Sequence, residues 1–383
     1  MTFWDDRLDD AARQALQPGQ PDDLNRSPDV LVVGGGAVGL AVAAACRRAG
    51  LGQVVTIEGA ARLASGASGS NGGAIAPDMH LLTDPPEMVA FGRRSRALYR
   101  EWDAEWGGAI GTWPTRWLNI FPAGEGPLVS RQAPGDIEAR PLPEEFQPIG
   151  EGELGELEPD VRLPEGGTAV LVDGQLGVNP QRLVAALAAR AGTVVTGVRM
   201  LGVERTGDRI ITVRTTAGDF TPGAVVMATG LLPEPWRTRQ RWVKGHMVAV
   251  APGPWRLGSV LAGPLGGGTP LGDGTIFCGG SFDEGDNTPD VRPEVSDPMA
   301  EALATLVPKA AGARISHRWC CFRPYVEGRQ PVVDRLPEVS NGWFAGGHFT
   351  TGIMMAAATG EAVAGWISEG RTPELVRTFS LAR

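Results

Sequence analysis

The sequence predicts an α/β fold with a βαβ unit near its start and a second, strand-rich region farther along the chain. Short apolar runs at residues 30–33 and 54–57 read as buried strands, and the alanine-rich stretch 40–49 between them reads as a helix. Further short apolar segments follow after residue 110. With 383 residues, 42% of them hydrophobic, the chain is long enough for two or three domains with a large core.

The turn between the first strand and the helix has the spacing G-x-G-x-x-G, formed by Gly34, Gly36 and Gly39. Gly34 permits a tight turn, Gly36 lets the backbone approach a pyrophosphate, and Gly39 lets the helix pack closely on the strand. The amides at the helix N-terminus then face the phosphates. Glu58 ends the second strand, where a carboxylate can accept a ribose hydroxyl. An ordinary glycine-rich turn is the alternative, but strand, helix, second strand and acid occur in the order that dinucleotide binding requires.

The composition argues against several classes of protein. A net charge of −9 disfavours a nucleic-acid partner, because binding phosphate backbones requires an excess of Lys and Arg. The sequence contains no apolar run of about 18 residues, so no transmembrane segment is predicted. Residues 1–28 lack the apolar stretch of a secretory signal. The four histidines are far apart, so no metal site is expected. The cysteines lack C-x-x-C spacing and the density of a disulfide scaffold, which favours a reducing cytoplasm: Cys46, Cys278, Cys320 and Cys321.

Two segments beside the βαβ unit have alternative interpretations. Residues 8–16 could form one short amphipathic helix before a linker, but a partly ordered extension is the favoured interpretation of residues 1–28. Residues 63–77 are rich in Gly, Ser and Ala, so this segment can lie flat against a planar ring system with its amides free to donate. A flexible linker is the alternative; the position directly after the nucleotide unit favours binding.

The rest of the chain predicts a mixture of helices and strands. The expected helices are residues 87–106, 181–191 after the N-cap Asn179, 299–307 and about 351–368. The expected strands are residues 113–121, 169–172, 194–198, 200–205, 209–216, 224–228, 244–251, 275–280 and 343–345.

Two strand ends are of particular interest. The four strands from 194 to 228 are expected to form a meander that returns to the main sheet and ends in Thr229 and Gly230, small residues where open α/β sheets bind ligands. The strand 343–345 runs into Gly346 and Gly347, and the free amides of the following helix point at whatever lies at the strand end.

Five segments together resemble the FAD-dependent D-amino-acid oxidase family, which includes glycine oxidase and sarcosine oxidase: Gly34-x-Gly36-x-x-Gly39 with Glu58, Ala67-Ser-Gly-Ser-Asn-Gly-Gly73, Ala228-Thr-Gly230, Phe322-Arg-Pro324 and Gly347-His-x-x-x-Gly352-Ile353. The resemblance covers about residues 29–367. It implies a Rossmann-like FAD-binding domain assembled from residues 29–83, 173–235 and 320–383, with an inserted antiparallel β-sheet (α+β) substrate-binding domain formed by 84–172 and 236–319.

Carried over by position, the family pattern assigns residues to the parts of FAD. The pyrophosphate would lie against the first turn and helix: Gly34, Gly36, Ala37, Val38 and Gly39. Glu58 would bind the ribose and the backbone of Val198 the adenine. The phosphate and isoalloxazine path would be lined by Arg62, Ser65, Ser68, Asn71, Gly72 and Gly73. The flavin would be cradled by Thr229, Gly230, Gly347, His348, Thr350, Thr351, Gly352 and Ile353.

The same resemblance assigns the substrate site. Arg323, within the family's Arg-Pro motif, would bind the substrate carboxylate through its bidentate guanidinium; a surface salt bridge is the alternative. Thr350 and His348 would lie beside the substrate, with His348 in a supporting role because the family's reaction needs no histidine base. Cys321 stands where oxidases of primary amino acids usually have glycine, and where sarcosine oxidase-like members attach FAD through a thioether. A small buried cysteine is the alternative.

The resemblance therefore implies FAD-dependent oxidation of an amine or amino acid, with hydride transfer from the C–N carbon to the flavin, an imine product, and reoxidation by O2 to give hydrogen peroxide. A dehydrogenase of the same fold that passes electrons to a quinone or a carrier is the alternative. A flavin-dependent hydroxylase is disfavoured, because Gly346 and Gly347 stand where hydroxylases of this fold have Gly-Asp. A non-catalytic nucleotide-binding module would lack the carboxylate clamp. The sequence leaves the oligomeric state open.

Overall fold

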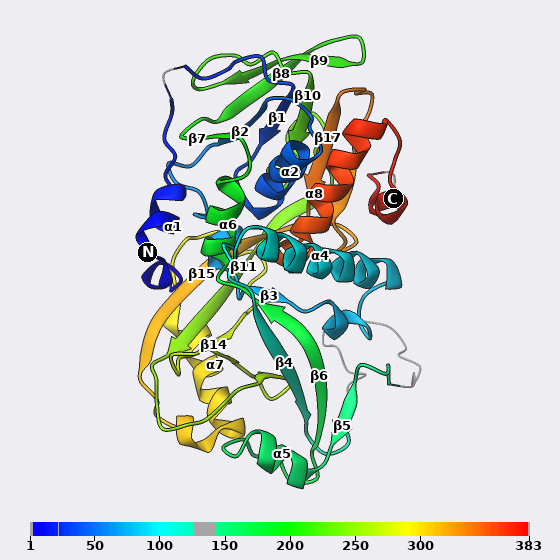
Figure 1. Cartoon of the computed structure of the whole chain (residues 1–383). Helices are drawn as coiled ribbons and strands as arrows, with labels where there is room; N and C mark the ends of the chain where they lie inside the picture. The colour runs from blue at the N-terminus through cyan, green and yellow to red at the C-terminus, as the bar shows by residue number, and fades with distance from the viewer. Residues whose placement is uncertain (1–2, 22, 126–141, 382–383) are drawn as a thin grey trace.

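The computed structural model describes residues 3–21, 23–125 and 142–381. In Figure 1 the upper part contains a parallel sheet with its helices, and the lower part contains two further sheets. Residues 126–141, which the sequence assigns to the substrate-binding domain, lie outside the described residues. Over the described ranges, no helix combines the length and the apolar character needed to cross a membrane.

The main sheet has six strands in the order β16-β17-β10-β1-β2-β7. All neighbours pair in parallel except β16, which is an antiparallel edge strand. Both faces of the central strands are covered, so these strands carry continuous apolar runs rather than an alternating pattern. The strands are β1 (Val30–Val33), β2 (Val54–Glu58), β7 (Thr193–Thr196), β10 (Ala224–Met227), β16 (Val332–Arg335) and β17 (Gly342–Gly346). The predicted α/β fold with a βαβ unit at its start is confirmed.

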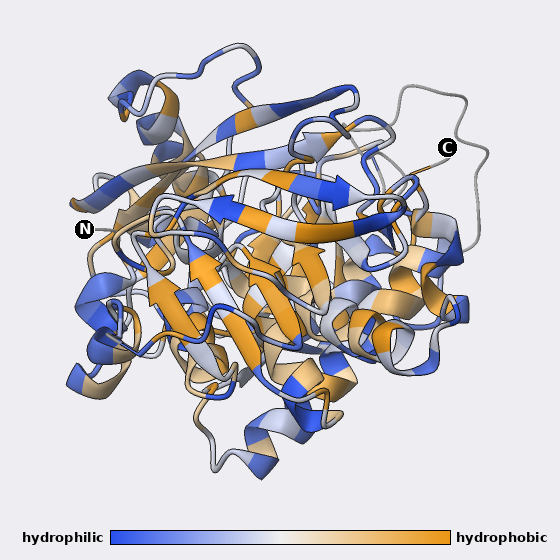
Figure 2. Cartoon of the chain, turned by 90° about the horizontal axis from the view of Figure 1, so that it is seen from above, coloured by the Kyte–Doolittle hydropathy of each residue, from blue (hydrophilic) through white to orange (hydrophobic). Residues whose placement is uncertain are grey.

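The predicted meander between residues 194 and 228 is wrong. β8 (Met200–Thr206) and β9 (Arg209–Thr215) form a separate two-stranded sheet, whereas β7 pairs with β2 and β10 with β1. β9 turns Ile210 and Val213 toward the core and leaves its other face in solvent, a one-sided pattern that suits a covering layer. Figure 2 shows this hairpin lying over the hydrophobic strands of the main sheet.

Helices cover the opposite face of the main sheet (Figure 1). α2 and α8 pack closely against each other, and α4 and α6 pack beside them. α8 is rich in alanine, and most of its residues are buried. The side chain of Asn179 accepts hydrogen bonds from the amides of Gln181 and Arg182, which confirms it as the N-cap of α6. The helices are α2 (Ala37–Arg48), α4 (Pro86–Glu105), α6 (Pro180–Ala188) and α8 (Gly352–Glu369).

The lower part is built from two largely antiparallel sheets. The first has the order β13-β14-β11-β15, with β11 (Gln240–Val250), β13 (Thr269–Pro270), β14 (Ile276–Gly279) and β15 (Ile315–Val326). The second has the order β12-β4-β6-β3, with β5 paired to β6; its strands are β3 (Ala74–Ile75), β4 (Trp113–Phe121), β5 (Gln147–Ile149), β6 (Thr168–Gly177) and β12 (Val260–Ala262). Two helices, α5 (Glu151–Leu157) and α7 (Pro293–Leu306), belong to this part.

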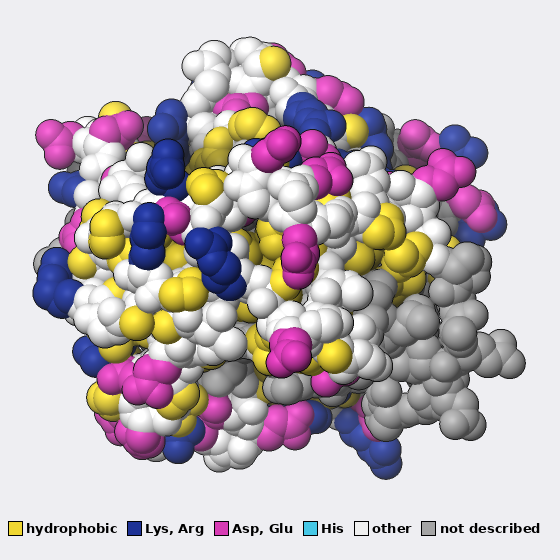
Figure 3. All heavy atoms as spheres, turned by 90° about the horizontal axis from the view of Figure 1, so that it is seen from below, with side chains coloured by type: hydrophobic (Ala, Val, Ile, Leu, Met, Phe, Trp, Pro, Cys, Tyr) yellow, Lys and Arg dark blue, Asp and Glu magenta, His cyan; other side chains and the backbone are white. Residues whose placement is uncertain are grey.

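Two strands cross the predicted domain boundaries. β6 runs through residue 173 and β15 runs through residue 320. The division of the chain into domains stays a prediction. On the described face seen from below, acidic and basic side chains lie interspersed among hydrophobic ones (Figure 3), the distribution of an ordinary solvated surface.

The segment before the first strand is packed against the molecule. α1 (Asp10–Ala15) falls within the residues where a short helix was considered, and Phe3 and Trp4 are each only 1% exposed. The favoured prediction of a partly ordered extension is therefore wrong for residues 3–16, because these aromatic side chains complete a hydrophobic cluster with distant strands. The remaining short elements are α3 (Ala67–Ser70) and 3-10 turns at Asp5–Arg7, Pro77–His80, Pro308–Ala310 and Glu374–Phe379.

The close packing of α2 and α8 depends on Gly360. A methyl group at this position would lie 2.6 Å from the carbonyl carbon of Ala41, far inside van der Waals contact. We expect Gly360→Ala to lower the free energy of unfolding by about 1–3 kcal/mol, measured by denaturant titration. Gly365→Ala in the same helix is the matched control, because open space surrounds Gly365; it should stabilise the protein by up to about 1 kcal/mol. Equal effects of the two substitutions would contradict this account of the packing.

Candidate active site

A cavity of about 1330 Å³ lies between the carboxyl ends of the main-sheet strands and the sheet formed by β11, β14 and β15. It gathers residues from segments that are far apart in sequence. Among the residues predicted to bind cofactor or substrate, those that line it are Gly34, Gly36, Val38, Glu58, Ser65, Ser68, Asn71, Gly72, Gly73, Thr229, Gly230, Cys321, Arg323, Gly347, His348, Thr350, Gly352 and Ile353.

The turn after β1 leaves no room for side chains. Gly34 has a φ of +117°, and a Cβ there would overlap the backbone carbonyl of Ala228 at the end of β10. A Cβ at Gly39, on the first turns of α2, would overlap the carbonyl of Gly34. Both glycines are therefore required by close backbone approach, which brings the N-terminus of α2 to the edge of the cavity.

The small-residue segment 63–77 folds over the N-terminus of α2. Ser68 on α3 accepts a hydrogen bond from the amide of Ala37 through its Oγ, at 2.9 Å. The side chain of Asn71 donates to the carbonyls of Ala67 and Ser68 and accepts from the amide of Gly73. These bonds give the segment a defined path along the cavity wall, rather than the freedom of a linker.

The Glu58 carboxylate is oriented by two backbone amides. Its Oε2 accepts from Gly35 and its Oε1 from Ala60, each at 2.8 Å. An ionised carboxylate has about four acceptor positions, so this side chain can accept further hydrogen bonds from a ligand hydroxyl. Glu58 also lines the cavity, next to Arg199 and Met200.

Five predicted site residues do not line the cavity. Gly39 and Ala37 lie in the first turns of α2, and Thr351 is the N-cap residue of α8. Val198 is buried, and its amide donates to the carbonyl of Glu58 at 2.9 Å. Arg62 donates to Asp5 at 2.6 Å and to Gln181 at 2.8 Å, which holds its guanidinium among protein partners.

Arg323 enters the cavity from β15 through a slot between two glycines. A Cβ at Gly245 would overlap its Nη1, and a Cβ at Gly280 would lie 2.6 Å from its Nη2. Nη1 donates to the carbonyl of Ser281 at 2.8 Å, and the guanidinium carbon lies 4.7 Å from the ring centroid of Phe282. Burial lowers the pKa of Arg323, which nevertheless stays protonated at neutral pH. Within the described ranges, no carboxylate forms an ion pair with this cation.

The loop that follows Gly280 is fixed by a buried lysine. Lys244 on β11 is fully buried, and its Nζ donates to Asp286 at 2.9 Å, to Thr288 at 3.3 Å and to the carbonyl of Asp290 at 2.6 Å. All three ammonium protons are thereby satisfied. The hydrogen bond from Lys244 contributes most to holding the pKa of Asp286 well below its usual range. Asn287 and Pro289 of the same loop line the cavity.

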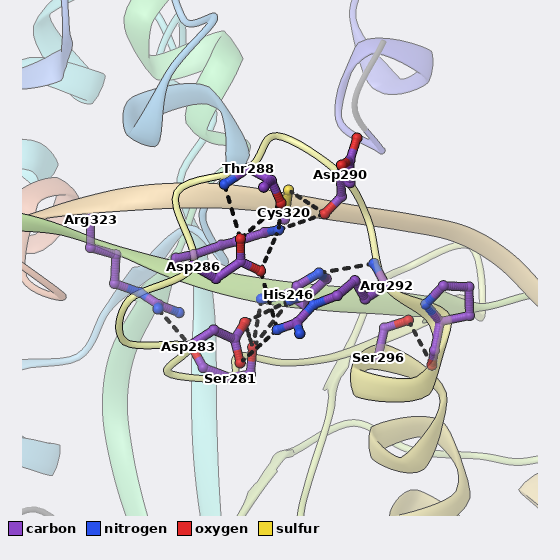
Figure 4. Close-up of polar contacts among 12 residues, drawn as sticks. His246, Ser281, Asp283, Asp286, Thr288, Asp290, Arg292, Ser296, Cys320 and Arg323 are labelled. Carbon is purple, nitrogen blue, oxygen red and sulfur yellow. Dashed lines mark hydrogen bonds and ion pairs between the residues drawn. The ribbon is translucent and has the colours of Figure 1, made fainter.

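A buried histidine fixes the other side of this loop (Figure 4). His246 contacts Asp283 through Nδ1 at 2.7 Å, and its Nε2 accepts from the backbone amide of Arg292 at 3.0 Å. The amide donor at Nε2 assigns the neutral ring proton to Nδ1. Ser281 accepts from the amide of His246 and donates to the same Asp283 oxygen. Since the Ser281 carbonyl also holds Arg323, this network positions the guanidinium.

The N-terminus of α8 reaches the cavity at Gly352 and Ile353. Thr359 donates its hydroxyl proton to the carbonyl of Met355, so His348 must donate from Nε2 to the Thr359 oxygen, at 3.0 Å. This arrangement leaves the Nδ1 of His348 without a proton. Burial lowers the pKa of His348 to about 4, so the ring is neutral at pH 7.

Cys321 lines the cavity as a buried thiol, beside half-buried Cys320. Burial is the largest effect on Cys321 and raises its pKa, although Arg323 acts in the opposite direction. The thiolate is the nucleophilic form of cysteine, so this environment does not favour covalent chemistry. Attachment of FAD at Cys321 stays a hypothesis.

Several aromatic residues that line the cavity were not assigned to the site from the sequence, beyond the expectation that tryptophans form part of a pocket wall. Trp242 and Phe282 are 41% and 46% exposed. The Nε1 of Trp117 is buried and has no hydrogen-bond partner among the described residues. Apart from Phe349, none of these residues belongs to a short motif, and segments far apart in sequence bring them together. The lining residues of this kind are Trp117, Trp242, Phe277, Phe282 and Phe349.

The residues of the cavity fit an FAD molecule. At one end, the glycine turn, the α2 N-terminus and Glu58 offer backbone amides and a carboxylate to a dinucleotide. Along the middle, the small-residue segment 63–77 leaves space for a flat ring system. At the other end, Arg323 and the aromatic side chains border the place where a substrate would meet that ring.

The burial of His348 predicts a pH-dependent stability of the apoprotein. Its folded-state pKa of about 4 lies below the unfolded value, so the unfolded chain takes up a proton first as the pH falls. We expect this group to remove about 3 kcal/mol from the free energy of unfolding between pH 6.5 and pH 4. His348→Gln keeps a donor for Thr359 but does not titrate. The difference between the two proteins in denaturant titrations should therefore vary with pH, and parallel curves would contradict the assignment.

Comparison with known proteins identifies relatives over most of the chain. The chain matches the family described as FAD dependent oxidoreductase over residues 29–366. It is 28% identical to the bifunctional ThiO/ThiG protein of Synechocystis sp., with 94% of this chain covered, and it spans about half (54%) of that relative's length. It is also 28% identical to glycine oxidase of Geobacillus kaustophilus, covering 93% of this chain and 97% of that one.

Solved structures share the fold. L-proline dehydrogenase from P. horikoshii superposes with a TM-score of 0.79 at 21% identity, covering 93% of this chain and 97% of the other. Glycine oxidase from Geobacillus kaustophilus gives a TM-score of 0.78 at 24% identity, covering 94% and 99%. The family predicted from five short segments is thereby confirmed: the chain belongs to the FAD dependent oxidoreductase family, whose cofactor is FAD.

Proposed function

We propose that this protein oxidises an amino acid or a related amine that carries a carboxylate, using FAD as its cofactor. The observation that carries this proposal is Arg323. Its guanidinium reaches the cavity, is sandwiched between two glycines, and forms no ion pair with a carboxylate of the described residues. A desolvated cation of this kind favours an anionic partner, and the planar guanidinium matches a carboxylate through two parallel hydrogen bonds.

The protein groups would orient the substrate and exclude water. Bound FAD supplies a two-electron acceptor for the hydride of the carbon that bears the amine. Arg323 would fix the carboxylate, while the rings of Phe282 and Phe349 enclose the substrate end of the cavity. Positioning of this type accelerates the reaction because the reacting atoms are held in line. The amine nitrogen loses a proton as the hydride leaves, which gives an imine. Water then hydrolyses this imine without help from a group of the protein.

The similarity to glycine oxidases supports an amine or amino acid as substrate. We further propose O2 as the electron acceptor, in keeping with the oxidase relatives. A dehydrogenase that uses a quinone or a carrier is the alternative, and the structural similarity to an L-proline dehydrogenase, which concerns the fold alone, is compatible with both. A cytoplasmic location, as the cysteine content favours, remains part of the proposal.

Substitution of Arg323 tests the carboxylate site. We expect Arg323→Gln to lower kcat/KM for an amino-acid substrate by about 30-fold or more, mainly through KM, because the carboxylate loses a desolvated charged partner. The corresponding amine without a carboxylate should be affected much less. Arg241→Gln is the matched control: Arg241 is 47% exposed, pairs with Glu284 and does not line the cavity. Equal losses with both substrates, or no loss, would remove Arg323 from this role.

The electron acceptor is tested by the flavin spectrum. The purified protein is mixed anaerobically with glycine, sarcosine, proline and a panel of D- and L-amino acids, and is then exposed to air. For an oxidase, we expect the flavin absorbance to bleach with a substrate and to recover in air with formation of hydrogen peroxide. Bleaching without recovery would establish the dehydrogenase instead. A flavoprotein that none of these compounds bleaches would contradict the proposed substrate class.

A further inference from the structure

The N-terminal strap, which we define as residues 3–16, lies before the segment that matches the family, residues 29–366. Phe3, Trp4 and Leu16 are nearly or fully buried. In Figure 1 this segment, in dark blue, runs along the side of the molecule beside α6 and the ends of β11 and β15. A segment outside the family match that buries such large side chains calls for a physical explanation.

The strap supports the cavity wall through an aromatic cluster. Phe3 stacks on Trp319, with ring centroids 5.1 Å apart and an interplanar angle of 4°. Trp4 packs edge-on against Phe277, at 5.4 Å. Phe277 and Met247 belong to the same cluster, and both line the cavity. They also flank Gly72, where an added Cβ would lie 3.3 Å from the Phe277 ring. The strap therefore packs directly against residues that line the cavity.

Two indole groups hold the small-residue segment in place. Trp4 donates from Nε1 to the carbonyl of Asn71 at 2.8 Å, and Trp319 donates to the carbonyl of Ser70 at 2.9 Å. These carbonyls belong to adjacent residues whose other faces line the cavity. The neighbouring Ser68 bonds the first amide of α2. One of the two indole hydrogen bonds to this turn thus comes from the strap.

Polar contacts fasten the strap at further points. Asp5 accepts from Arg62, and Arg62 also donates to Gln181, whose amide lies 3.4 Å from the carbonyl of Gly69. Arg7 donates to Thr275 at 3.0 Å, just before β14. The carbonyl of Leu16 accepts from the amide of Leu63, where the small-residue segment begins. Both ends of the strap are thereby tied to the segment that encloses the cofactor.

We propose that the N-terminal strap is a positioning element for the FAD, and that Trp4 is its central residue. By holding Asn71 through Trp4, and by packing Phe3 on the Trp319 that holds Ser70, the strap keeps the small-residue segment in its binding conformation before FAD arrives. Preorganisation of this kind strengthens binding because less ordering is required on association. The hydrogen bond from Trp4 goes to the small-residue segment, so we expect the strap to act mainly on the cofactor. The inference is independent of the proposed substrate.

The test is the dissociation constant of FAD, measured by titrating apoprotein with FAD and following flavin fluorescence. Trp4→Phe keeps the ring and removes the N–H group. We expect its dissociation constant to rise about 5- to 20-fold, as the loss of one partly buried hydrogen bond implies. The matched control is Trp236→Phe, since the indole of Trp236 also donates to a backbone carbonyl, that of Pro337, but does not line the cavity. An unchanged dissociation constant in folded Trp4→Phe, with only apoprotein stability reduced, would overturn the proposal.

A second measurement uses the unmodified protein and so does not depend on a variant that folds. Coupling between two sites is reciprocal, so a strap that favours FAD binding must itself be stabilised by FAD. We expect saturating FAD to slow hydrogen exchange of the backbone amides in residues 3–16 by about 5- to 20-fold, the factor expected for the dissociation constant of FAD. Exchange in this segment that is the same with and without FAD would overturn the proposal, even if substrate turnover is normal.

Discussion

The structure depends on the close approach of backbones around the first turn. The carbonyl of Gly34 lies where a side chain at Gly39 would be, and the carbonyl of Ala228 lies where a side chain at Gly34 would be. Because β1, the start of α2 and the end of β10 meet without side chains between them, the N-terminus of α2 reaches the cavity, where Ser68 bonds its first amide and Gly36 and Val38 line the wall. A similar close approach of backbones occurs at Gly360, where α8, near the C-terminus, packs on α2.

From this constraint follows the position of the cavity. The carboxyl ends of β1, β2, β10 and β17 lie along one edge of the main sheet, which is where ligands of open parallel sheets bind. The chain leaves this edge to build the sheets that contain β4, β6, β11 and β15, and returns to it. The second wall of the cavity is therefore made by residues remote in sequence. One chain supplies both the dinucleotide end and the charged substrate end.

The sequence predicts the parts of this site that depend on local spacing. The turn at Gly34 and the cap Asn179 are confirmed, because each is determined by neighbours within a few residues or by one strand and one helix. Glu58 lies at the end of β2 and lines the cavity, and its binding of a ribose stays a prediction. The aromatic wall was not assigned residue by residue, since Trp117 is placed by the pairing of β4 with β6 and Phe282 by the loop that follows β14. The strap was misjudged for the same reason: its aromatic residues find their partners more than 200 positions away, at Phe277 and Trp319.

The distribution of charge explains why Arg323 is left for a ligand. The antiparallel sheet buries two other groups capable of carrying positive charge next to it, and each has its own acid: Lys244 pairs with Asp286, and His246 contacts Asp283. These pairings engage Asp283 and Asp286 of the loop after Gly280, and the loop turns a carbonyl, that of Ser281, toward Arg323. A carbonyl orients the guanidinium without neutralising it. Among the described residues no carboxylate forms an ion pair with Arg323, so a bound carboxylate would balance its charge.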